Sequence, residues 1–180
     1  MKSKSNININ ARTRFIALLG ILGAQAIVLS LLENFIPPVP GLPPGAKLGF
    51  SNIVTMFTAS TMGFMPALYI TVIKAVFAGA TRGSAAFFMS FAGGVLSTAV
   101  MSLLLKSKRK TFGIIGIAVL SAAAHNLGQL IVAAIISGTS LFVSYAPFLL
   151  IYALITGCLT GSMLKIIMPA LQRQSSFFKM

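Results

Sequence analysis

The chain has 180 residues, of which 57% are hydrophobic and 8% are charged, with a formal net charge of +13 and a mean hydropathy of +0.95. Soluble domains carry about 25% charged residues, so this composition excludes an ordinary soluble domain and predicts that the bilayer is the solvent for most of the chain. Nucleic-acid binding is not expected, because the Lys and Arg residues lie at the ends of apolar runs and not on one polar face.

Charges, prolines and glycines divide the sequence into six apolar segments, and about 20 apolar residues are needed to cross the hydrocarbon core. We therefore expect an all-α membrane bundle of six transmembrane helices over residues 14–171, with tails at residues 1–13 and 172–180. The expected helices are 14–36, 48–64, 66–81, 85–105, 112–136 and 144–171. The second and third are short and form a tight hairpin, so their polar backbone ends must face protein or a wet cavity.

The basic residues predict the orientation of the bundle. Eleven of the fourteen Lys and Arg residues fall between the N-terminus and Arg14, in the loop between the fourth and fifth segments, and from Lys165 to the C-terminus. The positive-inside rule then places both termini and that loop in the cytoplasm, with Lys47 and Arg82 outside. We expect a multi-pass protein of the plasma membrane.

Five of the eight prolines lie in the first external loop, at residues 37–45, which therefore cannot form a regular helix. Two interpretations remain open. The loop is either a stiff connector or a lid over an outward-facing pocket, and its candidate lid residues are Pro40, Gly41, Pro43 and Pro44.

Polar residues follow this loop at the external start of the second segment. Lys47 and Asn52 stand where free N–H groups and the helix dipole favour an anion. Alternatively, Lys47 reaches out to the membrane interface, while Ser51 and Asn52 satisfy the helix end.

Lys74 is an ionisable residue within the third segment, and such residues usually face a cavity, a partner or a functional path. Glu33 is the only acidic residue of the chain, and it could pair with Lys74 if the first and third helices touch. Otherwise a phosphate or carboxylate of a ligand could neutralise the ammonium.

The fifth segment contains the densest polar group of the sequence, His125, Asn126 and Gln129. His125 and Gln129 are four residues apart and share one helical face, which favours a role in ligand binding. For Asn126 we favour a hydrogen bond between helices. Metal binding is not expected, because the chain has one His, one Cys and one acid.

Small residues recur at helical spacing, as in Gly20 with Ala24, Ala124 with Gly128 and Gly157 with Gly161. Such pairs allow close approach between membrane helices, and those on the first helix are candidates for contact with another membrane subunit. No acid pair for acid–base catalysis and no ATP-binding loop is present in the sequence. We expect no enzymatic activity and no cofactor.

Three stretches, Lys47–Thr55, Phe91–Ser97 and Ala124–Gln129, resemble the membrane family called Gx transporter, whose members are often labelled heptaprenyl diphosphate synthase component I. The resemblance covers residues 15–164. More distantly, the layout resembles the S components of energy-coupling factor (ECF) transporters of bacterial plasma membranes. That likeness implies a first external loop that covers the ligand, a separate transmembrane coupling subunit and two ATPases. Where S components often have paired alanines at the coupling contact, this chain has Gly20 and Ala24.

Two hypotheses follow. The first is a substrate-binding membrane subunit that captures a small anionic or amphipathic ligand, such as a vitamin, a quinone precursor or a prenyl compound, with the binding residues Lys47, Asn52, Lys74, His125 and Gln129. The alternative is a non-catalytic membrane scaffold for enzymes that make prenyl diphosphates or menaquinone. The synthase label fits catalysis poorly, because prenyl transfer needs magnesium-binding carboxylates that this sequence lacks.

Overall fold

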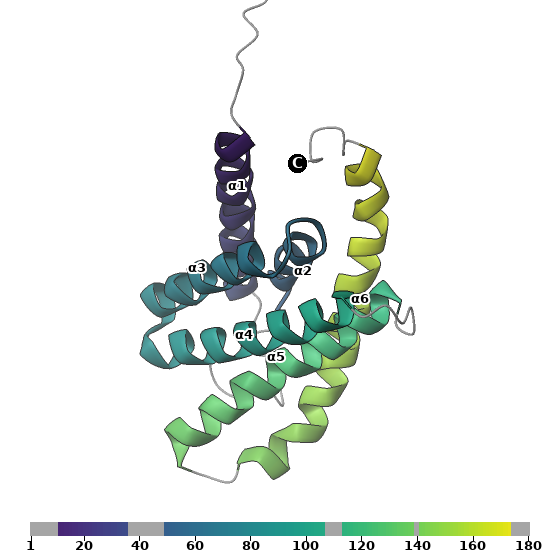
Figure 1. The fold of residues 1–180 in the computed structure, drawn as a ribbon. Helices are drawn as coiled ribbons and strands as arrows, with labels where there is room; N and C mark the ends of the chain where they lie inside the picture. The colour runs from purple at the N-terminus through teal and green to yellow at the C-terminus, as the bar shows by residue number, and fades with distance from the viewer. Residues whose placement is uncertain (1–10, 36–48, 107–112, 139–140, 174–180) are drawn as a thin grey trace, which may run out of the picture.

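The computed structural model describes residues 11–35, 49–106, 113–138 and 141–173, and this part of the chain is helical (Figure 1). The described elements are α1 (Ala11–Leu32), the 3₁₀ turn η1 (Glu33–Phe35), α2 (Asn52–Thr61), α3 (Phe64–Arg82), α4 (Ser84–Lys106), α5 (Ile114–Ser137) and α6 (Leu141–Arg173). The start of α1 and the end of α6 lie at the same end of the molecule in Figure 1. The expected all-helical membrane architecture is confirmed.

Five of the described helices, α1, α3, α4, α5 and α6, are long and apolar enough to cross a membrane. The remaining helix, α2, has 10 residues, whereas a helix that crosses the membrane needs about 20. It is shorter than the 48–64 expected from sequence, because Gly63 has a φ of 94° and separates α2 from α3. Phe64 therefore begins α3 instead of ending α2. At the other end of the chain, α6 continues past Pro169 to Arg173.

Helices α3 to α6 pack in chain order, with the most extensive contacts between α5 and α6. Small residues permit this packing. A Cβ atom on Gly157 would lie 2.4 Å from the Cα of Val119, and one on Gly128 would lie 2.7 Å from the Cα of Gly93. The small-residue pairs predicted on α5 and α6 thus lie where helix backbones meet, apart from Ala124, which is half-buried.

Hydrogen bonds between polar side chains join the packed helices. The hydroxyls of Thr71 on α3 and Thr98 on α4 are 2.9 Å apart. Asn126 on α5 donates to the carbonyl oxygen of Leu149 on α6 at 3.0 Å, which confirms the interhelical bond favoured for this residue. These bonds satisfy polar groups that would otherwise be costly inside a membrane.

Helix α1 lies apart from α6, and a groove of about 790 Å³ runs between α1, α2 and α6. The walls are almost entirely aliphatic and aromatic, with contributions from Leu22 and Val28 on α1, Phe57 on α2, and Ile167 on α6. Gln25 is the polar exception in the groove. Helices α3 to α6 therefore pack tightly against one another, whereas the side of α2 that faces α1 borders an open groove.

Replacing Gly157 by Val should destabilise the protein, because the added carbons would enter the backbone of α5 at Val119. Overpacking of this kind costs about 1–3 kcal/mol, so we expect a lower temperature at which the size-exclusion peak of the detergent-solubilised protein is half lost. Gly20→Ala is the matched control, since no atom lies within 4 Å of a Cβ there. Equal melting temperatures for Gly157→Val and the wild type would contradict this packing.

Candidate functional site

The first residues of α2 bring an amide against the buried cation of α3. Lys74 is 6% exposed and lies near the middle of α3. Its Nζ donates a 2.7 Å hydrogen bond to Oδ1 of Asn52, the first residue of α2. Because Asn52 is neutral, it gives the ammonium a hydrogen-bond acceptor and no opposite charge.

A second polar pair lies on α5. His125 and Gln129 are both buried, and their side-chain nitrogens are 2.7 Å apart. The amide N–H of Gln129 can donate to Nε2 of a neutral imidazole, which places the ring proton on Nδ1. Nδ1 faces the backbone of Gly93 without normal hydrogen-bond geometry, and Oε1 of Gln129 has no partner among the described residues. The pair therefore keeps unused hydrogen-bonding capacity.

Gly49 joins the two pairs. A Cβ on this residue would lie 2.8 Å from Nδ2 of Asn52 and 3.7 Å from the ring of His125. Its φ of 86° also disfavours other residues. Lys74 in turn acts electrostatically on His125. Asn52, Lys74, His125 and Gln129 thus form one polar cluster inside the membrane bundle, contributed by α2, α3 and α5, and we call these four residues the polar cluster.

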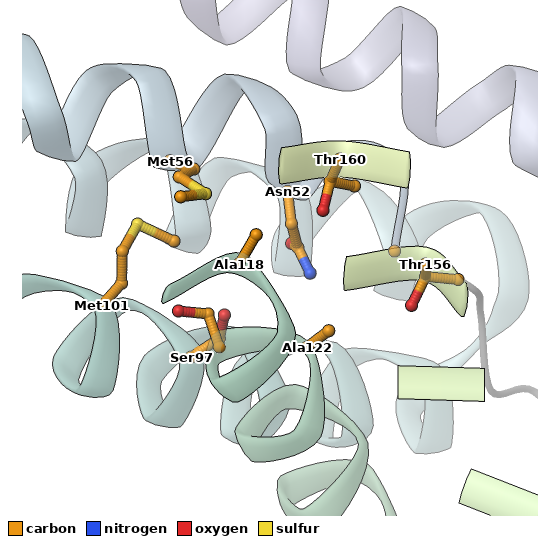
Figure 2. A pocket seen from close by; sticks show the side chains of 10 residues that line it. Asn52, Met56, Ser97, Met101, Ala118, Ala122, Thr156 and Thr160 are labelled. Carbon is orange, nitrogen blue, oxygen red and sulfur yellow. The ribbon is translucent and has the colours of Figure 1, made fainter. Parts of the chain in front are cut away.

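A small cavity of about 10 Å³ adjoins the polar cluster and has room for about one water molecule. Figure 2 shows Met56 and Met101 at one end, Thr156 and Thr160 at the other, and Asn52 between them. Ser97, Ser121 and small residues complete the wall. Helices α2, α4, α5 and α6 therefore meet around a small space lined by hydroxyl and amide groups together with Met and small residues.

The position of α2 depends on the end of α1. The backbone N–H of Phe50 donates to Oε1 of Glu33 in η1, and Glu33 is buried. Glu33 also interacts electrostatically with Arg82 at the end of α3. Glu33 therefore connects the N-terminal end of α2 to α1 and α3.

The polar cluster offers hydrogen-bond donors and positive charge, which suit a carboxylate or phosphate. Among the described residues there is no group of three or more His, Cys, Asp or Glu that could hold a metal ion. Glu33, the sole carboxylate side chain of the sequence, contacts the entrance of α2. The arrangement suits binding of an anion better than acid–base chemistry.

The structure brings together four of the five residues predicted to bind ligand, whereas Lys47 and the candidate lid, Pro40, Gly41, Pro43 and Pro44, lie outside the described residues. Gly20 and Ala24 lie on an exposed face of α1, and Ala24 lines the groove beside α2.

Sequence reasoning missed the hydroxyl residues of the cavity. Their spacing was an available signal, because Ser121 precedes His125 by four residues and Thr156 precedes Thr160 by four. Extending the His125 and Gln129 face by one helical turn would have identified Ser121.

Comparison with known proteins adds a family and a fold. A search of curated protein sequences returned no match. A solved structure described as the S component of a bacterial ECF transporter matches with a TM-score of 0.55 and 21% identity, over 94% of this chain and 98% of that chain. This likeness supports a common fold. The family model for heptaprenyl diphosphate synthase component I matches residues 22–167, and the chain therefore belongs to the heptaprenyl diphosphate synthase component I family.

Proposed function

We propose that this protein is the substrate-binding membrane subunit of an ECF-type uptake transporter and that it binds a small anionic or amphipathic molecule taken from the extracellular side. The polar cluster is the proposed binding site. Both termini then lie in the cytoplasm, as the positive-inside distribution of Lys and Arg favours.

The burial of Lys74 beside Asn52 carries this proposal. A charged side chain in the middle of a membrane helix is expensive, and it is usually kept for a ligand, an ion path or an essential partner. The neighbouring His125 and Gln129 are neutral hydrogen-bonding groups, and Asn52 lines a water-sized cavity. Buried polar side chains of three helices therefore meet at one place in the bundle.

A membrane-embedded coupling subunit with two ATPases is the proposed partner. The exposed small residues Gly20 and Ala24 would let a foreign helix approach α1 closely. The apolar groove between α1, α2 and α6 provides a surface for such a helix inside the bilayer. No ATP-binding loop is present in the sequence, so energy for uptake would come from the partner.

The family description favours one alternative, a non-catalytic scaffold that holds a prenyl diphosphate synthase at the membrane. In that case the polar cluster would serve helix packing alone. The two proposals predict different co-purifying proteins, which makes them separable by experiment.

The substitution Lys74→Met should abolish retention of a small molecule by the protein purified from its native membrane. Hydrogen bonds to charged groups contribute about 1.5–3 kcal/mol, so we expect affinity to fall about 10- to 100-fold. Native mass spectrometry measures the retained mass. Lys106→Met, at the exposed end of α4, is the matched control and should retain it. Wild-type retention by Lys74→Met would remove Lys74 from the site.

The substitution Ala24→Trp should block partner binding, because the indole would fill the groove beside α2. We expect affinity purification of the wild type from native membranes to recover a membrane coupling subunit and ATPases, and the Trp variant to lose both. Ile135→Trp, on the exposed surface of α5, is the control that should keep them. Recovery of a soluble prenyl synthase, without ATPases, would favour the scaffold instead.

A further inference from the structure

The cavity beside Asn52 has a lining that anion binding leaves unexplained. Among the described residues, its wall contains four hydroxyl side chains and no charged residue, with Ser97 on α4, Ser121 on α5, and Thr156 and Thr160 on α6. A hydroxyl inside a membrane protein normally bonds to its own helix or to a neighbour. Three helices thus present hydroxyl oxygens to one space, where a single polar group could contact several of them.

The hydrogen-bonding state of these hydroxyls differs from helix to helix. Thr156 donates to the carbonyl of Tyr152 at 2.7 Å, and Thr160 donates to that of Gly157 at 3.2 Å. Their oxygens remain able to accept. Ser121 is 3% exposed, and its Oγ has no hydrogen-bond partner among the described residues. A buried hydroxyl without a partner costs about 1–3 kcal/mol, and a polar ligand group in the cavity would remove this cost.

Asn52 connects the cavity to the polar cluster. Its Oδ1 accepts from Lys74, while its Nδ2 points into the space between Ala122 and Thr156 in Figure 2. On α5, Ser121 lies one helical turn before His125, and His125 one turn before Gln129. Asn52 thus contacts the cation of the polar cluster through one atom of its amide and lines the cavity with its neutral donors and acceptors.

We propose that this cavity is a second subsite, which binds the uncharged hydrogen-bonding part of the same ligand whose anionic group contacts the polar cluster. The ligand class is then a compact, water-soluble anion that also carries hydroxyl or carbonyl groups. This inference rests on the proposed function and narrows its substrate class.

A prenyl chain does not fit this surface. Methylene groups placed against Ser97 and Ser121 would leave their hydroxyls unsatisfied. The large apolar groove lies on the other side of α2, where Ile53, Val54 and Phe57 face it, whereas Asn52 and Met56 face the cavity. Helix α2 therefore separates the polar site from the surface that would suit a hydrocarbon tail.

The cavity has room for about one water molecule, so a ligand must enlarge it. Met56 and Met101 form its end opposite the threonines. Methionine has three rotatable bonds and adapts its shape more readily than branched residues do. Movement of these two side chains would open space without displacing a helix.

The test uses the full-length protein in detergent and two probes, the water-soluble fraction of yeast extract and the chloroform-soluble lipids of the expressing cells. The chain has no Trp and one Cys, so stability is measured as the temperature at which half of the size-exclusion peak is lost. We expect the water-soluble fraction to raise this temperature of the wild type by about 5 °C. The lipid fraction should leave it unchanged.

The double variant Ser97→Ala, Ser121→Ala should need about tenfold more extract for half of the stabilisation. Ser102→Ala is the matched control, because Ser102 is also a buried serine of α4 with an unpaired Oγ but lies outside the cavity. The control should respond like the wild type. Single Ala variants replace the double variant if it does not fold.

The outcomes separate the two proposals. Stabilisation of the wild type by lipids alone, a full response of the serine variants, or an equal loss in Ser102→Ala would overturn the second subsite and leave anion binding standing. No stabilisation of the wild type by either fraction, or a full response of Lys74→Met, would overturn the proposed function and with it this inference.

Discussion

One ammonium group buried in the membrane determines how the centre of this protein is built. Lys74 lies in the middle of α3, where charge is costly, and a hydrogen bond from its Nζ to Asn52 holds it in place. Meeting that bond requires the first residue of α2 to lie against the middle of α3. The short α2, the glycine at residue 49 and the contact between Glu33 and Phe50 all serve to place Asn52 there.

The position of α2 gives its two sides different tasks. One side, with Asn52 and Met56, faces hydroxyls of α4, α5 and α6 across a small cavity. The other, with Ile53 and Phe57, faces α1 across a large apolar groove. Ligand binding and partner binding would therefore share one short helix. A ligand that replaced Asn52 as the partner of Lys74 would release the first residue of α2, and the position of α2 also shapes the groove proposed for the partner.

Much of this arrangement follows from the sequence alone. Long apolar segments bounded by charged residues predict the helices. The cost of burying a charge in a membrane identifies Lys74 as a candidate site residue. The four-residue spacing of His125 and Gln129 places both on one helical face. Spacing alone places Ser121 on the face of His125, but it does not show which hydroxyls of other helices lie opposite, because Ser and Thr occur throughout membrane helices and can bond to their own backbone. Only the packing of three helices shows that Ser121 and Thr160 face the same space.

The break between α2 and α3 at Gly63 could not be predicted either, since a glycine inside an apolar run predicts neither its φ nor a helix end.

A crystal structure of the protein purified from its native membrane, soaked in the water-soluble extract, tests the central claim most directly. We expect density of a small molecule within hydrogen-bonding distance of Nζ of Lys74 and Oε1 of Gln129. Density that instead shows Lys74 paired with Glu33 and a polar cluster filled by protein side chains would contradict a ligand-binding role.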